Sequence, residues 1–374
     1  MAGRLKVLLF VLTALALMVK GGTDRVLLED VSLALIVGID LDQNGKLVFS
    51  ASSPVFSSEA KQKEEEYTSP SSTLRQSRDK DDKTFVAITS GGKVQEMIIG
   101  KKVMQHEHWS MLMEPFLRDP KNSIRGRIIM VDGPVSDMIH MHPEDKPRLP
   151  LYLTKLIDTA HRRNLTVKTT LEDLRRDNYE KGKTVSVTEM KRQGERVIVT
   201  GTALLDEAGK YQMSIDDNET KLLLMLQRRS KGESSFTFHA LDQPDGGVFP
   251  TDAYSFSANK ISVKTKTGYR DGKFKFDVKV KLRVTLIERM FPLDIRKHAD
   301  KLERDINRQL EQRFERLIHD FQSRQIDPVG FGLYARAYEY RHWRTVQDHW
   351  GKAMSEADVN VKVDSTIIAM GVSK

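Results

Sequence analysis

The sequence predicts a multi-domain α+β protein in which antiparallel or mixed β-sheets are each flanked by α-helices. Three observations lead to this prediction: alternating strands are joined by hairpin signals, amphipathic helices follow the strands, and 374 residues are enough for about two or three domains. Strands and helices that come in separate runs are typical of α+β folds rather than of a doubly wound sheet. With 39% hydrophobic and 30% charged residues, the chain can form buried cores.

The first 22 residues resemble an export signal. Arg4 and Lys6 precede an apolar run from Val7 to Val19, which is the order of a charged start and an apolar centre in a signal peptide. A membrane-spanning helix needs about 20 apolar residues. The run is shorter, so we expect residues 1–22 to be a signal-like segment rather than an ordinary transmembrane helix.

The first half of the chain, residues 23–194, is predicted to be an N-terminal region that one long charged segment interrupts. Apolar runs on both sides of Asp42–Gly45 predict a hairpin, because Asn-Gly is a strong turn signal. Residues 57–83 contain thirteen charged residues and one aromatic residue, a composition that predicts an exposed, mobile loop. Strand-like patterns follow on both sides of Gly194, and we place the main domain boundary there.

The second half, residues 195–374, shows a more regular pattern. Residues 259–288 predict a long hairpin that turns at Asp271-Gly272, and its second strand alternates between apolar and polar residues. Such alternation indicates a sheet covered on one face. Residues 294–325 then carry an apolar stripe at helical spacing, which predicts a long amphipathic helix. Packing of this helix on the sheet is the simpler interpretation, and a coiled-coil seam is the alternative.

Two helix starts have the spacing of a capping box, in which two side chains bond the first backbone N–H groups of a helix. The first pairs Thr169 with Glu172, and the second pairs Asp216 with Glu219. We therefore expect helices to begin after Thr169 and after Asp216.

Composition excludes several kinds of chemistry. The chain has no cysteine, so disulfides, thiolate metal sites and cysteine nucleophiles are all excluded.

The net charge of +8 is mild and, for an exported protein, favours an anionic membrane surface over nucleic acid. Residues 260–316 hold 17 basic and 9 acidic residues. We prefer to read them as a solvated face, with anionic lipid as the alternative. We predict no nucleic-acid binding, because aromatic residues are not interleaved for base stacking.

No motif predicts a catalytic, cofactor or metal site. Asp40–Gly45 begins like a calcium loop, but its twelfth position is Ala51 instead of glutamate. Ser90–Lys93 lacks the glycine and hydroxyl residues of a phosphate loop. Two histidine pairs lack a convincing third ligand for zinc: His106 with His108, and His140 with His142. We therefore predict a protein that is not an enzyme and has no cofactor.

The C-terminal residues carry a resemblance to a known family. Asp327, Pro328, Gly330 and Gly332 are followed by an aromatic-rich stretch with Trp343 and Trp350, and then by a valine-rich strand that ends near Gly371. Further matches include "GYRDGKFKFDVKV", "FLRDPKNSIRGRIIMVDG" and "GTALLDEAGKY". In this order, the segments resemble the Ger(x)C family, the C subunit of bacterial spore germinant receptors, over nearly the whole chain.

The resemblance also implies how the N-terminus is used. Family members are usually lipoproteins whose lipidated cysteine is followed by Trp-Asp-Arg. Here Gly22 occupies the expected cysteine position before Thr23-Asp24-Arg25, so no lipidation site is predicted. Three alternatives remain open: an uncleaved signal that acts as an anchor, cleavage near Gly21, or an engineered or mis-sequenced site.

The resemblance implies a fold of three mixed α/β domains and a non-enzymatic role in germination. The protein would act with integral A and B membrane subunits at the outer face of the spore inner membrane, and no direct small-molecule ligand is predicted. A rival hypothesis is an exported enzyme, or a small-ligand- or metal-binding protein, with His140, His142 and the charged segment 57–83 as candidates. A third is a decayed receptor subunit. Trp343 and Trp350 could face a partner, but a buried position is the preferred interpretation.

Overall fold

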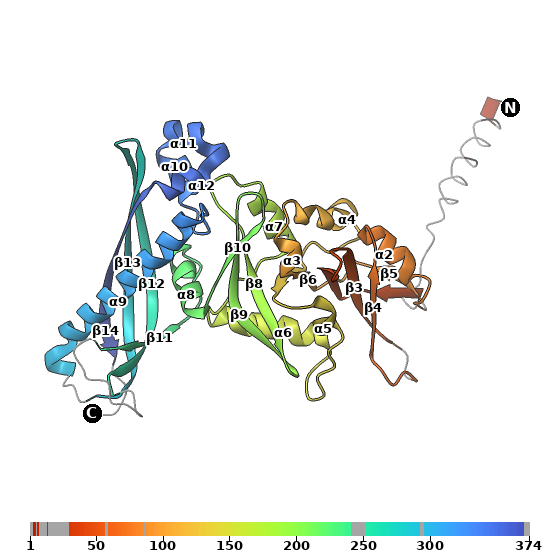
Figure 1. The fold of residues 1–374 in the computed structure, drawn as a ribbon, viewed down its shortest axis with the longest axis horizontal. Helices are drawn as coiled ribbons and strands as arrows, with labels where there is room; N and C mark the ends of the chain where they lie inside the picture. Colours follow the sequence, from red (N-terminus) through yellow and green to blue (C-terminus); the bar gives the residue numbers. More distant parts are fainter. Residues whose placement is uncertain are drawn as a thin grey trace.

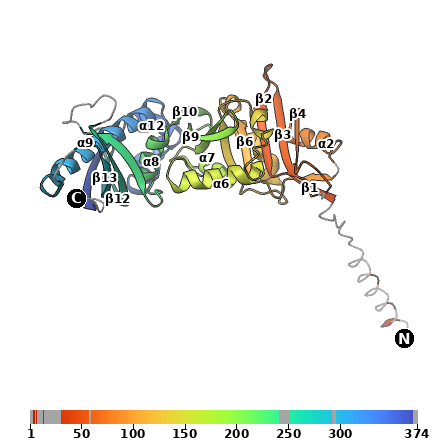
Figure 2. The same cartoon turned by 90° about the horizontal axis from the view of Figure 1, so that it is seen from below.

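The computed structural model describes residues 30–56, 59–85, 87–240, 251–291 and 295–369, together with residues 3, 4, 6 and 13. The predicted apolar run is almost entirely outside the described residues, as are Gly22 and Gly371. Two large sheets lie one after the other along an elongated molecule (Figures 1 and 2). Mixed and antiparallel sheets with flanking helices confirm the predicted α+β class.

An eight-stranded mixed sheet forms the N-terminal part. Its strand order is β10-β9-β8-β7-β6-β2-β3-β4. The four central strands β2, β6, β7 and β8 are parallel, and antiparallel hairpins extend the sheet on both sides. The strands are β2 (Ile36–Leu41), β3 (Leu47–Pro54), β4 (Glu64–Pro70), β6 (Glu96–Gly100), β7 (Arg127–Val131), β8 (Ser186–Gln193), β9 (Arg196–Leu205) and β10 (Tyr211–Ile215). β1 (Val31–Leu33) and β5 (Ile88–Ser90) form a separate parallel pair.

Helices cover both faces of this sheet. α5 (Val135–Ile139) and α6 (Leu149–Arg162) enclose one core. On the other face, a second core includes α3 (Lys101–Met104), η2 (Trp109–Met113), α4 (Glu114–Arg118) and α7 (Leu171–Asn178). Because both faces are buried, the central strands are continuous apolar runs such as Met97 to Ile99.

The prediction of a mobile loop over residues 57–83 is wrong. β4 pairs along its whole length with β3, and α2 (Leu74–Asp81) follows it. The Thr73 side chain caps α2 by accepting from the backbone N–H of Gln76. The charged composition was misleading because β4 is an edge strand and Arg75 and Asp79 of α2 face solvent. Residues 57 and 58 lie outside the described residues.

Gly194, the predicted domain boundary, lies in the turn between β8 and β9. Its φ of +60° suits glycine. The eight-stranded sheet continues beyond this turn to Ile215, and the first strand of the next sheet begins at Ser234. The division into residues 23–194 and 195–374 stays a prediction.

A four-stranded sheet, ordered β11-β12-β13-β14, forms the C-terminal part. The predicted hairpin is confirmed: β12 and β13 turn at Asp271-Gly272, where both residues have positive φ. β13 alternates between buried and exposed residues, as predicted. The strands are β11 (Ser234–His239), β12 (Ala253–Arg270), β13 (Lys273–Arg289) and β14 (Asp358–Ala369).

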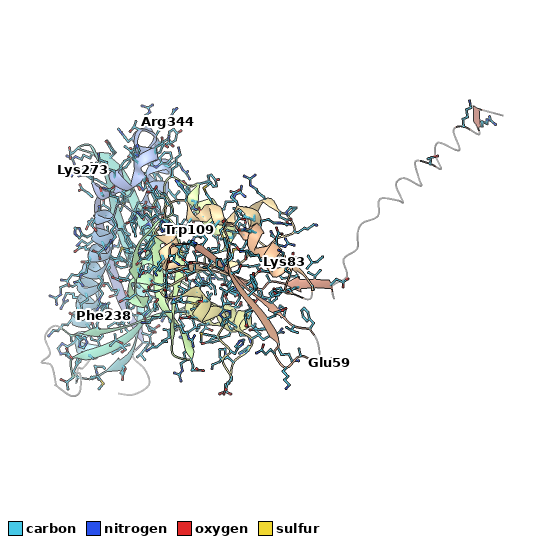
Figure 3. The ribbon with its side chains drawn as sticks, turned by 45° about the vertical axis from the view of Figure 1, so that its right-hand side comes forward. Glu59, Lys83, Trp109, Phe238, Lys273 and Arg344 are labelled. Carbon is cyan, nitrogen blue, oxygen red and sulfur yellow. The ribbon has the colours of Figure 1, made fainter. Side chains whose placement is uncertain are left out.

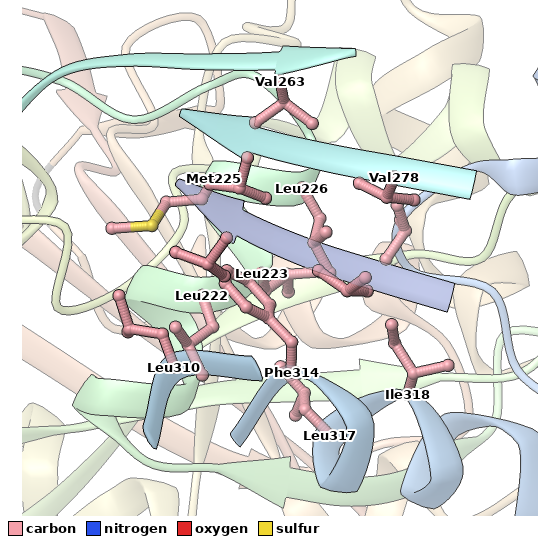
Figure 4. Packing of buried hydrophobic residues seen from close by; sticks show 14 of the residues in the cluster. Leu222, Leu223, Met225, Leu226, Val263, Val278, Leu310, Phe314, Leu317 and Ile318 are labelled. Carbon is pink, nitrogen blue, oxygen red and sulfur yellow. The ribbon is translucent and has the colours of Figure 1, made fainter. Parts of the chain in front are cut away.

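The long helix α9 (Ile295–Ser323) packs on one face of this sheet, which confirms the prediction of a sheet-packed amphipathic helix. Figure 4 shows Leu310, Phe314 and Ile318 of α9 in the same buried cluster as Val278 of β13 and the leucines of α8 (Asp217–Leu226). Four short helices follow α9. They are α10 (Phe331–Tyr338), α11 (Tyr340–Val346), η3 (Gln347–His349) and α12 (Trp350–Ser355). Three of them, α10, α11 and α12, contribute to the same core.

The two predicted capping boxes have different outcomes. Asp216 and Glu219 form the box that begins α8, as predicted. At α7 the prediction is wrong by one residue, because Thr170 and Asp173 form the box. The hydroxyl of Thr169 instead donates to the backbone oxygen of Ser186 at 2.6 Å. Within the described residues, no helix is both long enough and apolar enough to cross a membrane.

Candidate functional sites

The structure shows a hairpin turn at the calcium-like motif and no metal-ligand group at the first histidine pair within the described residues. Asp42 organises the β2–β3 turn, where its Oδ1 accepts from the N–H groups of Asn44 and Lys46 at 2.8 Å. The hairpin interpretation of this segment is therefore confirmed. His106 and His108 are exposed, and neither belongs to a group of potential metal ligands among the described residues.

His142 meets two glutamates from the segment predicted to be a loop. Glu64 and Glu66 lie two positions apart on β4 and so share one face of the strand. The Nε2 atom of His142 lies 3.5 Å from Oε2 of Glu66, and one potential ligand atom from each residue lies within 4.8 Å of the others. We call these three residues the acid–histidine cluster.

The cluster contains carboxylate oxygens without partners. Glu64 is 7% exposed, and the Oε1 atoms of Glu64 and Glu66 have no hydrogen-bond partner among the described residues. Burial, followed by the negative charge of Glu66, raises the pKa of Glu64, which the positive charges of Arg148 and His142 partly oppose. Buried carboxylates are usually paired or bound to a metal. Carboxylate oxygens and imidazole nitrogens are both ligands of Zn²⁺, and zinc sites with three protein ligands keep one position open.

The sequence prediction missed Glu64 and Glu66. An E-x-E spacing places both acids on one face only if the segment is a strand, and the charged composition had indicated a loop. The structure brings His142 to these acids, whereas His140 contacts the hydroxyl of Thr68 at 3.5 Å. The signal that could have found the cluster is therefore the strand periodicity of "EEEYTSP".

A mostly apolar cavity of about 240 Å³ lies beneath α2 and contains a second buried acid. Val37, Phe49 and Phe116 contribute apolar walls, and Asp81 lines the same cavity. Asp81 is 4% exposed, and its Oδ1 has no hydrogen-bond partner within the described part of the chain. Burial, with a smaller contribution from the charge of Asp82, raises the pKa of Asp81 to about 7. An apolar cavity with one such group is typical of small-ligand sites.

Asp327 organises the contact between the two large sheets. It is fully buried, and its carboxylate accepts from the N–H groups of Gly330 and Gly332 and from Nε1 of Trp350, each at 2.8 Å. Its backbone oxygen accepts from the N–H of Thr184 at 2.9 Å. The residues that carry the family resemblance therefore hold one turn and join it to the segment before β8.

The glycines of this turn permit a close backbone contact. A Cβ atom on Gly332 would lie 2.5 Å from Cα of Gly182, so only glycine fits there. Two ion pairs flank the contact: Arg336 with Glu180 at 2.8 Å and Lys181 with Asp348 at 2.6 Å. We call this region, from Asp327 to Asp348 with residues 180–184, the inter-sheet junction.

The structure buries both tryptophans, whereas Lys279 and Lys281 of the basic segment are exposed. Trp343 is 4% exposed and Trp350 is fully buried, so the prediction of a buried position is confirmed. Lys279 and Lys281, on the open face of the four-stranded sheet, both pair with Asp364. In Figure 3, Lys273 and Arg344 lie at the end of this sheet that is far from Glu59.

Two family models together match most of the chain. The spore germination protein N-terminal domain matches residues 24–192, and the spore germination B3/GerAC-like C-terminal domain matches residues 200–371. The chain belongs to this family of spore germination proteins, as the resemblance predicted.

The chain is also similar in sequence to one curated protein and in fold to one solved structure. The chain is 24% identical over 177 residues to spore germination protein KC of Bacillus subtilis (strain 168). That alignment covers 46% of this chain and 41% of the relative's length. The crystal structure of the GerBC protein matches with a TM-score of 0.57 over 89% of this chain and 96% of that one, at 16% identity, which supports the shared fold.

Proposed function

We propose that this protein is a non-enzymatic subunit of a nutrient germinant receptor. It acts with A and B membrane subunits at the outer face of the spore inner membrane and is required to trigger germination. The match of both halves of the chain to germination-protein models is the observation that carries this proposal. The inter-sheet junction supports a structural role, because the hydrogen bond from Thr184 to Asp327 and two ion pairs join the two halves.

Deletion of the gene tests the proposal. Mutant spores should lose their response to at least one nutrient, measured as loss of spore refractility, and should still germinate when treated by a nutrient-independent route. Complementation with the intact gene should restore the response. Protein tagged at its C-terminus should co-purify with an A and a B subunit from spore membranes in detergent. An unchanged response to every nutrient, with no membrane partner recovered, would contradict the proposal and favour a decayed subunit.

A second candidate function is metal binding by the acid–histidine cluster. It is favoured by the unpartnered oxygens of Glu64 and Glu66 beside the imidazole of His142. These residues would supply three ligands to Zn²⁺ or Mn²⁺ and leave a coordination position open. This function is compatible with a receptor subunit, because a bound ion would fix the edge strand β4 to the segment after α5.

Calorimetric titration of the full chain with Zn²⁺ and with Mn²⁺ tests metal binding. Glu66→Gln should weaken binding by at least about tenfold, because it removes one charged ligand. Glu65→Gln is the matched control, since Glu65 is the neighbouring residue on the opposite face of β4 and makes the same change in net charge. Equal affinities in the two variants would show that the cluster does not bind the metal.

A further inference from the structure

A cavity of about 460 Å³ is lined by residues of α7 and of the C-terminal end of α8, apart from the acid–histidine cluster. Three segments form its walls: residues 161–186, which include α7 and the start of β8; the C-terminal end of α8; and the loop that leads to β11. Residues of both halves of the chain therefore line one space. Its volume is in the range of ordinary small-molecule sites.

The lining is strongly basic. It includes six Lys or Arg residues and two Asp residues. The acids are already paired: Asp177 accepts from Lys183 at 2.6 Å and Arg176 at 3.0 Å, and Asp173 lies 2.9 Å from Arg176. The basic residues are Lys168, Arg176, Lys183, Arg228, Arg229 and Lys231.

The cations of the α8–β11 loop are the ones available to a ligand. Arg229 and Lys231 are exposed, and neither has a carboxylate partner among the residues that the structure describes. Arg228 lies over the ring of Tyr334, 5.4 Å from its centroid, and also faces no acid within the described ranges. The positive charge of this wall is therefore not neutralised by the protein.

Three residues that line the same cavity each have a buried polar atom without a partner in the described part of the chain. Ser186 is 7% exposed, and its Oγ has no hydrogen-bond partner in the described part of the molecule. The Oγ of Ser230 and the Oε1 of Gln227 are likewise buried and unpartnered. Buried polar atoms are nearly always hydrogen-bonded. Two hydroxyl donors beside uncompensated cations are suited to the oxygens of an anion.

The loop that carries the cations is held in place by Asn164. This residue is fully buried, and its side-chain amide donates to the backbone oxygen of Lys231 at 2.8 Å and to Oγ of Ser234 at 3.1 Å. Its Oδ1 accepts from the N–H of Lys231 at 2.8 Å. Because the loop is already ordered, a ligand would not have to supply the free energy for ordering it.

We propose that this cavity binds a small multivalent oxyanion, a molecule with two or more carboxylate or phosphate groups. Arg229 and Lys231 supply charge, and Ser186 and Ser230 donate hydrogen bonds. Since both halves of the chain line the cavity, the bound anion bridges them and stiffens their connection. This inference does not depend on the proposed receptor function. The same chemistry is available from a soluble metabolite or from an anionic lipid headgroup.

Binding to the full chain at low ionic strength tests the proposal and separates these sources. Citrate and pyrophosphate serve as soluble probes in calorimetry, and phosphatidylglycerol vesicles serve as the lipid probe. We expect saturable binding that weakens at least about tenfold in Arg229→Ala/Lys231→Ala. Lys264→Ala/Lys266→Ala makes the same charge change on the exposed side of β12 and should leave binding unchanged.

The outcomes are distinct. Citrate or pyrophosphate binding that depends on Arg229 and Lys231 supports a site for a soluble oxyanion. Binding of vesicles alone, with the same dependence, identifies the lipid headgroup as the source. No binding of any probe, or equal weakening in both double variants, overturns the proposal.

Ser186→Ala provides an independent test, because it removes the hydroxyl without changing charge. We expect affinity for the bound probe to fall severalfold, whereas the melting temperature does not fall, since the hydroxyl has no protein partner to lose. Unchanged affinity in this variant would overturn the role of the cavity as the binding site.

Discussion

The regions around the two large sheets differ in how completely their buried carboxylates are hydrogen-bonded. In the eight-stranded sheet and its helices, Glu64, Asp81 and Glu96 are all buried, and each has one carboxylate oxygen without a partner among the described residues. Beside the four-stranded sheet, Asp327 is equally buried but binds three donors, and Asp305 accepts from Tyr254. These three acids of the first region are thus left incomplete, whereas these two acids of the second region are satisfied.

Whether a buried acid has all its hydrogen-bond partners distinguishes candidate binding sites from residues that only stabilise the fold. A satisfied buried acid stabilises the fold around it, whereas an unsatisfied one is destabilising unless a ligand, an ion or a proton completes it. Glu96 shows the second case clearly. Its Oε1 accepts from the hydroxyl of Thr154 and lies 3.5 Å from Arg127, yet burial still raises the pKa of Glu96 to about 8. We therefore expect function mainly in the N-terminal part and at the basic cavity between α7 and α8.

The largest expected effect is in the C-terminal scaffold. Phe314→Ala should lower the free energy of unfolding by about 3–5 kcal/mol, because Phe314 is fully buried between α9 and the sheet. Denaturant unfolding measures the change. Glu315→Ala, at the exposed neighbouring position, should change stability by less than about 0.5 kcal/mol. Similar losses in both variants would show that α9 does not pack on the sheet as described.

Asp327→Asn should lower the free energy of unfolding by about 1–3 kcal/mol. The amide keeps the shape of the side chain but has one acceptor oxygen, so at least one of Gly330, Gly332 and Trp350 loses its partner. Thermal unfolding measures the effect. If the variant were as stable as the parent, the hydrogen bonds of Asp327 would not stabilise the fold, and Asp327 would no longer differ from the unsatisfied acids of the N-terminal part.

Asp81→Asn should stabilise the folded protein at alkaline pH, whereas Asp327→Asn destabilises it. The substitution removes a buried charge without breaking any bond to the unpartnered Oδ1, so it should raise the free energy of unfolding by about 1 kcal/mol at pH 8.5. Asp79→Asn on the exposed side of α2 is the control. Destabilisation by Asp81→Asn would mean that Asp81 has a structural partner after all.

The pH dependence of the same variant sharpens this comparison. The pKa of Asp81 is raised to about 7, so the folded state holds this proton more tightly than the unfolded state does. Its contribution to stability is complete below about pH 3.8 and is lost as the pH rises through 7. The loss of stability between pH 5.5 and 8.5 should therefore be smaller in Asp81→Asn. Equal losses in parent and variant would contradict the raised pKa.

The smallest expected effect is on the open face of the four-stranded sheet. Lys281→Ala should change the free energy of unfolding by less than about 0.5 kcal/mol, because exposed ion pairs such as Lys281 with Asp364 contribute little. Urea unfolding at low and at high salt measures it. A larger loss that persists in high salt would indicate that this face is part of the scaffold.

The C-terminal fold could be predicted because each signal was local. Alternation along Phe274–Leu286, the Asp271-Gly272 turn and the stripe of the long helix each determine one element, and neighbouring elements pack together. The N-terminal sheet could not be predicted in the same way. Its strands pair across long separations, as Ile39 does with Ile99, and its edge strand has the charge content of a loop.

The candidate sites were harder to predict than the folds. His142 was recognised as a potential ligand, but its partners come from β4, more than seventy residues earlier in the chain. The basic cavity likewise combines Ser186 with Arg229 and Lys231, which no sequence spacing connects. In contrast, Asp327, Gly332 and Trp350 lie in one segment, so the family pattern identified them before their contacts were known.

The elongated shape places the first strand and the last strand far apart. β1 lies at one end of the molecule and β14 belongs to the sheet at the other end (Figure 2). If the chain is held through the segment before β1, the four-stranded sheet is the part that reaches farthest from the point of attachment. The inter-sheet junction, where Gly182 and Gly332 touch backbone to backbone, is then one of the connections that carry a mechanical load between the two ends, together with α8.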